Sequence, residues 1–242
     1  MFSSLLHGLP YQIDVWLHVA AGSIALATFW TAAAVRKGGQ LHRNAGKLFM
    51  LAMCGILATG VMLVLRRFAD GNPIAGTYLG YLFFITGQAC WLAWRAVQDK
   101  ADWRVMVARP AWRMWMWSSL LAGIATFALG MQTGNPVLLG FSLIGPALFV
   151  RMWRFARRGP TRSNWHVILH YQSILGAGIA AHVAFLGVGM AHVWPLLAKV
   201  WPSLPPALIY AFPWYAPIAM AVVAVFVLNR RHGSKGRTLA RA

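Results

Sequence analysis

Acidic residues are scarce in this chain, which has four Asp and no Glu among its 242 residues. Apart from Asp14, none of them lies within or near a long hydrophobic run. Many proton and cation transporters use buried carboxylates, so the sequence disfavours that class of protein. The lysines all lie in polar connectors, which leaves none in mid-membrane to form a Schiff base with retinal. They are Lys37, Lys47, Lys100, Lys199 and Lys235.

Two features of redox and secreted proteins are also missing. Cys54 and Cys90 stand alone in separate hydrophobic runs and form no Cys-x-x-Cys pair. This argues against a thiol–disulfide enzyme, and we expect both cysteines to be packing residues. Residues 1–12 lack the positive charge that opens a secretory signal, and the run at about 13–35 is too long for a signal peptide core. That run is therefore expected to remain as a membrane span.

Hydrophobic residues make up 59% of the chain, and its mean hydropathy is +0.58. A soluble domain of this length could not bury so much apolar surface, so the sequence predicts a polytopic membrane protein. The formal net charge is +18, but the cations fall in short clusters between apolar runs. This pattern is typical of membrane topology and argues against a nucleic-acid-binding protein.

The hydropathy pattern predicts an all-α fold, a polytopic bundle of seven transmembrane helices that forms one integral membrane domain over residues 1–242. Each span requires about 20 mostly apolar residues. Pro146 is expected to kink the fifth span, and Pro213 and Pro217 to bend the seventh. The Pro-rich region from Trp194 to Pro206 is interpreted as an interfacial loop anchored by Trp. The predicted spans are residues 13–35, 48–65, 78–97, 114–132, 137–153, 165–193 and 207–228.

The basic connectors predict the orientation of these spans. Nineteen of the 22 Lys and Arg residues lie in the first, third and fifth connectors and the C-terminal tail, and three lie elsewhere. Because cytoplasmic loops carry an excess of cations, we expect the N-terminus outside and the C-terminus inside, in the inner membrane of a bacterial cell. The basic loops are expected to meet anionic lipids. A six-span alternative, with the Pro-rich region lying flat, would place the basic tail outside.

Four of the eight histidines lie in the predicted span 165–193, namely His166, His170, His182 and His192. The middle of this span, residues 176–181, consists of Gly, Ala and a single Ile. Its small side chains leave room for close neighbours or for a flat ligand. Because ionisable side chains inside a membrane are costly, they are functional candidates by default. This span is therefore the centre of the expected site.

Helical rise separates the histidines into two sets. At about 1.5 Å per residue, His18 in the first span and His182 lie at similar depths in the outer half, with His192 at the rim. On the inner side, His166 and His170 stand one turn apart on one face, and His42 lies in the first connector. We therefore expect an outer set and an inner set.

Three ligands are compatible with these histidines. Imidazoles from facing helices are axial ligands of haem b, although the 12 residues from His170 to His182 turn the second ring by about 120°, which favours one haem at most. A transition metal is the second. Asp14, one turn before His18, would then either bind the metal or hydrogen-bond to a residue that binds it. A quinone is the third, because His and a carboxylate near the membrane edge can relay the protons of a quinol. Each histidine could instead simply hydrogen-bond across helices.

Two motifs accompany the histidines. The first span contains His18-Val-Ala-Ala-Gly22, and the first connector reads Arg36-Lys37-Gly38 and then Leu41-His42-Arg43-Asn44-Ala45-Gly46. With His170, Ile174 and the small-residue run to Phe185, they resemble a family of predicted bacterial membrane proteins known as domain of unknown function 2306. The resemblance covers roughly residues 14–185, and His182 departs from it, because a small or hydroxyl residue is expected there. It implies a polytopic helical fold without an activity, and it draws attention to His18, His42, Arg43 and His170.

The preferred hypothesis is a haem-binding or quinone-linked redox component, with haem b or a quinone as its cofactor. In it, His18 and His182 face one another in the outer half and share a ligand or a hydrogen-bonded partner, while His170 and His42 act on the inner side. For a metal, His18, His182 and Asp14 are the expected ligands, and Arg43 is a further functional candidate. The alternatives are a non-redox transporter and an assembly or interaction protein that uses the same cavity, with partner subunits or a second copy of the chain.

Overall fold

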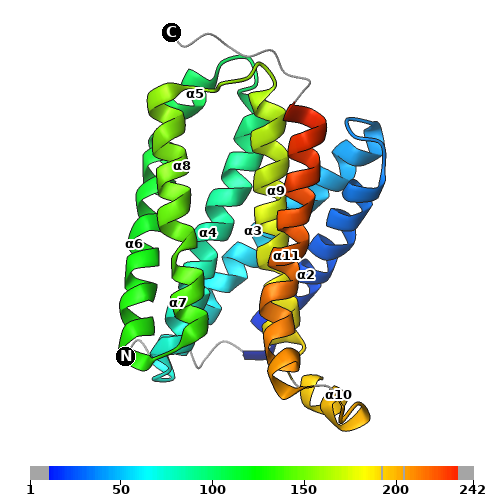
Figure 1. Ribbon diagram of the computed structural model, residues 1–242, viewed down its shortest axis with the longest axis vertical. Coiled ribbons are helices and arrows are strands. Elements are labelled where there is room, and N and C mark those ends of the chain that lie inside the picture. The colour runs from blue at the N-terminus through cyan, green and yellow to red at the C-terminus, as the bar shows by residue number, and fades with distance from the viewer. Residues whose placement is uncertain (1–10, 192, 204, 234–242) are drawn as a thin grey trace.

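The computed structural model describes residues 11–191, 193–203 and 205–233, and regular structure within them is helical. In Figure 1 the long helices run up and down side by side, and α10 projects at the lower end. Helices α7 and α8 follow one another and together make one long rod. The elements are α2 (Tyr11–Ala34), α3 (Gln40–Ala69), α4 (Pro73–Gln98), α5 (Trp103–Ala108), α6 (Pro110–Thr133), α7 (Pro136–Ser142), α8 (Ile144–Arg158), α9 (Trp165–Ala184), the π-helical turn η1 (Phe185–Gly189), α10 (Trp194–Val200) and α11 (Pro206–Gly233).

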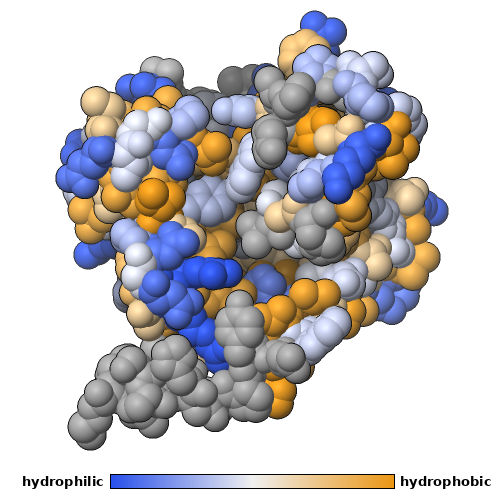
Figure 2. All heavy atoms as spheres, turned by 90° about the horizontal axis from the view of Figure 1, so that it is seen from below, coloured by the Kyte–Doolittle hydropathy of each residue, from blue (hydrophilic) through white to orange (hydrophobic). Residues whose placement is uncertain are grey.

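Six helical segments are long and apolar enough to cross a membrane. Large hydrophobic side chains are exposed on them, and Trp16, Leu121 and Val222 are each more than half exposed. Such surfaces suit lipid rather than water. Figure 2 looks onto the end that carries α10, where hydrophobic residues reach the outline of the molecule on several sides. The chain therefore has the architecture of a multi-pass helical membrane protein. The six segments are 13–34, 40–69, 110–133, 136–158, 165–187 and 211–232.

Helix α4 has the length of a span but is not one of these six. It packs against α3, α6 and α9, so much of its surface meets protein rather than the surroundings. Several of its buried side chains are polar, including Tyr81, Thr86 and Gln88. Ser119 of α6 donates a hydrogen bond of 2.9 Å to the Gln88 carbonyl oxygen. Polar side chains are tolerated in a helix enclosed in this way, because neighbouring helices supply their hydrogen-bond partners.

Helix α3 begins eight residues before the predicted second span and continues to Ala69. The connector expected at 36–47 is therefore much shorter, and Gly38, with φ of +77°, makes the turn. His42, Arg43 and Arg66 consequently lie on the helix rather than in loops. Hydropathy marks the apolar part of a helix, whereas the backbone hydrogen bonds of α3 continue past it into the polar flanks.

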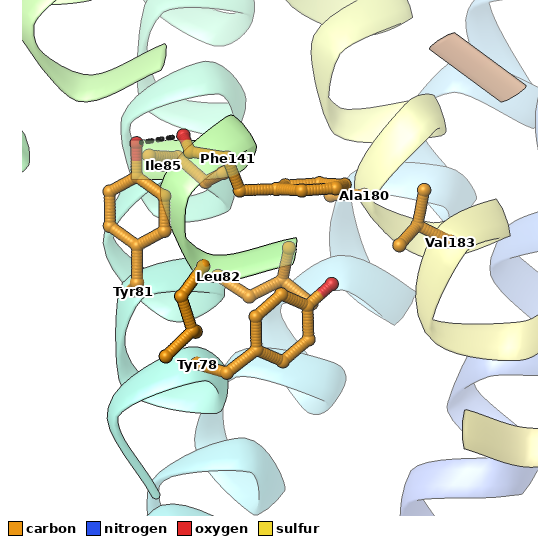
Figure 3. Close-up of a cluster of buried hydrophobic side chains, with 8 residues drawn as sticks. Tyr78, Tyr81, Leu82, Ile85, Phe141, Ala180 and Val183 are labelled. Carbon is orange, nitrogen blue, oxygen red and sulfur yellow. Dashed lines mark hydrogen bonds between the residues drawn. The ribbon is translucent and has the colours of Figure 1, made fainter. Parts of the chain in front are cut away.

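The fifth span is interrupted at Leu143, between α7 and α8 and three residues before Pro146. Proline lacks the N–H that would continue the helical ladder, and its ring crowds the preceding turn. Tyr81 of α4 bridges the interruption. Its hydroxyl donates to the Phe141 carbonyl at 2.9 Å (Figure 3), and it accepts from the Gly145 N–H at 2.6 Å. Backbone groups freed within a membrane need such partners.

The predicted span 165–193 is not one continuous α-helix. Helix α9 ends at Ala184, and residues 185–189 form the π-helical turn η1. The Trp194 indole donates to the Leu186 carbonyl at 2.7 Å, and the ring of Trp214 lies against Gly187. The interfacial loop expected from Trp194 to Pro206 also differs from the prediction, because its first seven residues form α10.

Three clusters of buried side chains hold the bundle together. Figure 3 shows the first, in which Tyr78, Tyr81, Leu82 and Ile85 of α4 meet residues of α7 and α9. The second lies near the ends of α4, α6, α8 and α9 and is rich in Trp and Met. The third joins α2, α3, α4 and α9 through small residues such as Ala25, Ala52 and Ala177, which pack around Phe49. The histidine-bearing helices α2, α3 and α9 therefore meet in the third cluster.

Candidate functional site

His18 contacts helix α3 rather than α9. Its Nδ1 lies 2.9 Å from the Thr59 hydroxyl, and that hydroxyl donates to the Gly55 carbonyl at 2.8 Å. Because the hydroxyl proton is used in this way, Thr59 accepts from His18 Nδ1–H. This tautomer leaves a lone pair on His18 Nε2.

Asp14 pairs with Arg66 of α3 and not with His18. The two side chains form an ion pair, and both are largely buried, at 19% and 7% exposed respectively. A carboxylate held by a guanidinium is poorly placed to orient the imidazole one turn away. The contact therefore ties α2 to the far end of α3.

His182 uses both of its ring nitrogens within the protein. Its Nδ1 donates to the Gly178 carbonyl one turn earlier, at 2.7 Å. Its Nε2 accepts from the Trp30 indole N–H at 3.0 Å, and the rings of Phe29 and Trp30 stand edge-on to it. No lone pair remains for a metal or haem iron unless the Trp30 bond is broken.

The predicted shared site of His18 and His182 is wrong. His182 binds Trp30, which follows His18 by 12 residues along α2. Twelve residues are about 18 Å of rise and about 120° of rotation, so His18 and the residue that His182 contacts lie at different levels and on different sides of α2. The two histidines were expected at similar depth because both helices were treated as upright spans with matched ends. In the structure, α9 contacts the later part of α2, at Phe29 and Trp30.

The expected metal site is not assembled either. Among the residues that the structure describes, no group of three or more His, Cys, Asp or Glu side chains is placed to hold a metal ion. The small-residue run of α9 has a protein neighbour instead of a flat ligand, because a Cβ at Gly178 would overlap the ring of Phe29. His192, expected at the outer rim, lies outside the described residues.

His42 and its neighbours cap the end of helix α2. The last carbonyls of a helix lack partners within it. His42 Nδ1–H donates to the Ala32 carbonyl at 3.0 Å, and Lys37 donates to Ala32 and Ala33. Partial burial of the ammonium lowers the pKa of Lys37.

Arg43 closes the same connector. Its guanidinium donates to the Gly38 carbonyl at 2.8 Å and to the Gln40 side chain at 2.7 Å. The motif around His42 and Arg43 thus has a structural task, which is to hold the turn between α2 and α3.

His170 brings α9 against α4 at the same end of the bundle. Its Nδ1–H donates to the Ala93 carbonyl at 3.0 Å. His170 lies within electrostatic range of both His42 and His166. The Nδ1 of His166 is buried and has no hydrogen-bond partner. His42 of α3 and His170 of α9, two members of the expected inner set, are therefore within electrostatic range of one another.

The hydrogen bonds of His42 and His170 define their chemistry. A carbonyl oxygen can only accept, so both Nδ1 atoms carry the proton and both Nε2 atoms carry a lone pair. An imidazole held in this way has a fixed orientation and a fixed tautomer, as in many histidines that bind metals. Two such nitrogens from different helices are suited to accept protons or to ligate iron.

Arg151 receives no functional role from the sequence, because it is one of the five cations assigned to the fifth connector. In the structure it lies on α8, within a membrane-length segment, and lines a cavity of about 370 Å³. Its place within the apolar stretch that starts at Pro136 was the available signal, because an arginine at that depth is costly.

Comparison of the chain with family models, with curated proteins and with solved structures gave no match. The resemblance to domain of unknown function 2306 therefore rests on the motifs quoted above and stays a prediction.

Proposed function

We propose that the protein is a quinone-linked redox component of the bacterial inner membrane. The observation that supports this most directly is the pair His42 and His170, whose Nε2 lone pairs come from two helices within electrostatic range of each other. Oxidation of a quinol releases two protons and two electrons. Each imidazole takes one proton, and the electrons pass to an acceptor in a partner subunit.

Haem b is the second candidate ligand, and it would use the same two atoms. Axial histidines of haem proteins present one ring nitrogen to the iron while the other donates to a carbonyl or carboxylate. The Nδ1–H bonds of His42 and His170 fit that arrangement. The outer histidines do not support a haem, since both nitrogens of His182 are already bonded.

A reduced-minus-oxidised spectrum and a quinol assay test both forms of the proposal. With a quinone as ligand, the purified protein should oxidise a short-chain quinol in the presence of an artificial electron acceptor. His42→Ala and His170→Ala should each lower that rate by roughly 100-fold or more, which is the usual effect of losing a general base. With haem as ligand, both substitutions should abolish a b-type spectrum.

His182→Ala is the matched control, since it removes the same side chain from α9 away from the inner set. It should leave the rate or the spectrum within about twofold of the unchanged protein, provided that the variant remains folded. If neither quinol oxidation nor a chromophore is found in the unchanged protein, the redox proposal fails, and a transporter or an assembly protein remains.

We also propose that α4 is a seventh span, with the N-terminus outside and the C-terminus inside. Two observations support this. Helix α4 is 26 residues long and runs beside the other long helices. The basic α2–α3 connector, α5, the start of α9 and the end of α11 gather at the upper end of the bundle in Figure 1. Cations concentrated at one end predict that this end faces the cytoplasm.

Reporter fusions test the orientation. A reporter that is active only in the cytoplasm should work after Gly38, Asp102, Gly159 or Ala242 and should fail after Asn72 or Asn135. Activity after Asn72 would contradict the seven-span arrangement.

A further inference from the structure

A cavity of about 370 Å³ lies where α8, the start of α9 and the end of α11 meet. This volume is within the range of small-molecule sites, roughly 300–1,000 Å³. Its lining combines basic and amide side chains with apolar ones. The lining residues are Arg151, Phe155, Gly159, Pro160, Thr161, Arg162, Trp165, Ile168, Leu169, Gln172 and Asn229.

Two arginines give the cavity its charge. Arg151 comes from α8 and Arg162 from the α8–α9 connector, and both lie within electrostatic range of Tyr171. Both are partly buried. Within the described residues, neither guanidinium makes an ion pair with a carboxylate. Over the part of the chain that the structure describes, no carboxylate neutralises the positive charge of the cavity.

The four aspartates are all engaged or located elsewhere. Asp14 pairs with Arg66, and Asp99 pairs with Arg95 and Arg109. Asp102 accepts from a backbone N–H at the start of α5, and Asp70 lies at the end of α3, away from the cavity. Because the chain has no Glu, no side-chain carboxylate of the chain is available to Arg151 and Arg162.

Neutral groups add hydrogen-bonding capacity. Tyr171 and Gln172 both donate to the side-chain oxygen Oδ1 of Asn229, at 2.5 and 3.1 Å. This joins α9 to α11 and leaves the Asn229 amide N–H groups as donors. The cavity also borders the start of α9, where the positive end of the helix dipole favours an anion.

We propose that this cavity binds the headgroup phosphate of an anionic phospholipid. Two arginines without a carboxylate match a headgroup of net negative charge better than a zwitterionic one. Phe155, Trp165 and Leu169 supply an apolar wall that suits the glycerol and the first carbons of an acyl chain. The volume holds a headgroup but not two acyl chains, which continue along the apolar outer surface of the bundle.

Binding of defined lipids to the detergent-purified protein tests the proposal. Native mass spectrometry with phosphatidylglycerol should give a one-to-one complex, with phosphatidylcholine bound at least about tenfold more weakly. Arg151→Gln and Arg162→Gln should each weaken phosphatidylglycerol binding by about tenfold or more, as expected for losing one charge-assisted contact. Arg162 lies outside the helices, so its variant keeps the test informative if Arg151→Gln unfolds.

Arg154→Gln is the matched control, because Arg154 is an exposed residue of the same helix that does not line the cavity. It should leave lipid binding unchanged. The proposal is overturned if Arg154→Gln weakens binding as much as Arg162→Gln, or if phosphatidylcholine binds equally well. Displacement of the lipid by millimolar inorganic phosphate would overturn it too, because the site would then be one for a soluble anion. None of these results depends on the histidine site.

Discussion

Replacing Gly145 with Ala should lower the free energy of unfolding by about 3 kcal/mol, at the upper end of the usual cost of overpacking. A Cβ at this position would overlap the backbone oxygen of Ser119 and would lie 3.2 Å from the Tyr81 hydroxyl. A backbone atom cannot rotate away, so α6 and α8 must separate. The shift also weakens the hydrogen bond from the Gly145 N–H to Tyr81. Unfolding in detergent with increasing SDS measures the effect.

Gly140→Ala provides the control for this experiment. Gly140 lies on neighbouring α7, and no atom lies within 4 Å of a Cβ built there. Ala is favoured over Gly inside a helix by up to about 1 kcal/mol, so this variant should be neutral or slightly more stable. Equal losses for Gly145→Ala and Gly140→Ala would show that α6 and α8 are not in such close contact.

Asp14→Asn should cost about 3–5 kcal/mol, the range found when one partner of a buried ion pair is removed. The Arg66 side chain is 7% exposed, and Asp14 is the carboxylate it contacts. Removing that negative charge leaves a guanidinium in a poorly solvated place. The same unfolding assay measures the loss.

Two further variants separate charge compensation from a local effect at Asp14. Asp70→Asn makes the same change at an exposed aspartate and should cost less than about 0.5 kcal/mol. Asp14→Asn combined with Arg66→Gln removes both charges and should recover most of the stability lost in the single variant. If the double variant is less stable than Asp14→Asn, the ion pair is not what stabilises this junction.

Hydropathy predicted the class of the fold and the approximate place of each long helix. It failed where a helix extends beyond its apolar part. Helix α3 begins at Gln40 because helical hydrogen bonding continues through polar residues, and such residues look like a loop when hydropathy alone is considered. The kink expected at Pro146 lies three residues after the observed interruption at Leu143. It could be predicted because a proline prevents a continuous helix whatever surrounds it.

The candidate site was less predictable, because a sequence gives depth along a helix but not tilt or rotation about its axis. His18 and His182 were paired by depth alone, whereas the bonds of Thr59 and Trp30 place them apart. His42 and His170 were grouped because both lie near the basic end, and their joint role stays a prediction. The surroundings of Arg151 could not be inferred, because the cavity also includes Asn229 of α11, which is distant in sequence from α8 and α9.

The enclosed position of α4 has a consequence for biosynthesis. Ribosomes deliver the helices to the membrane in chain order, so α4 emerges before α6, α8 and α9, which later surround it. Until then, Gln88 and Tyr81 lack the hydrogen-bond partners that they have in the finished bundle. A nascent chain that stops after α4 therefore lacks the helices that make its polar side chains tolerable. If α4 is the proposed seventh span, we expect its retention in the bilayer to depend on translation proceeding through α9.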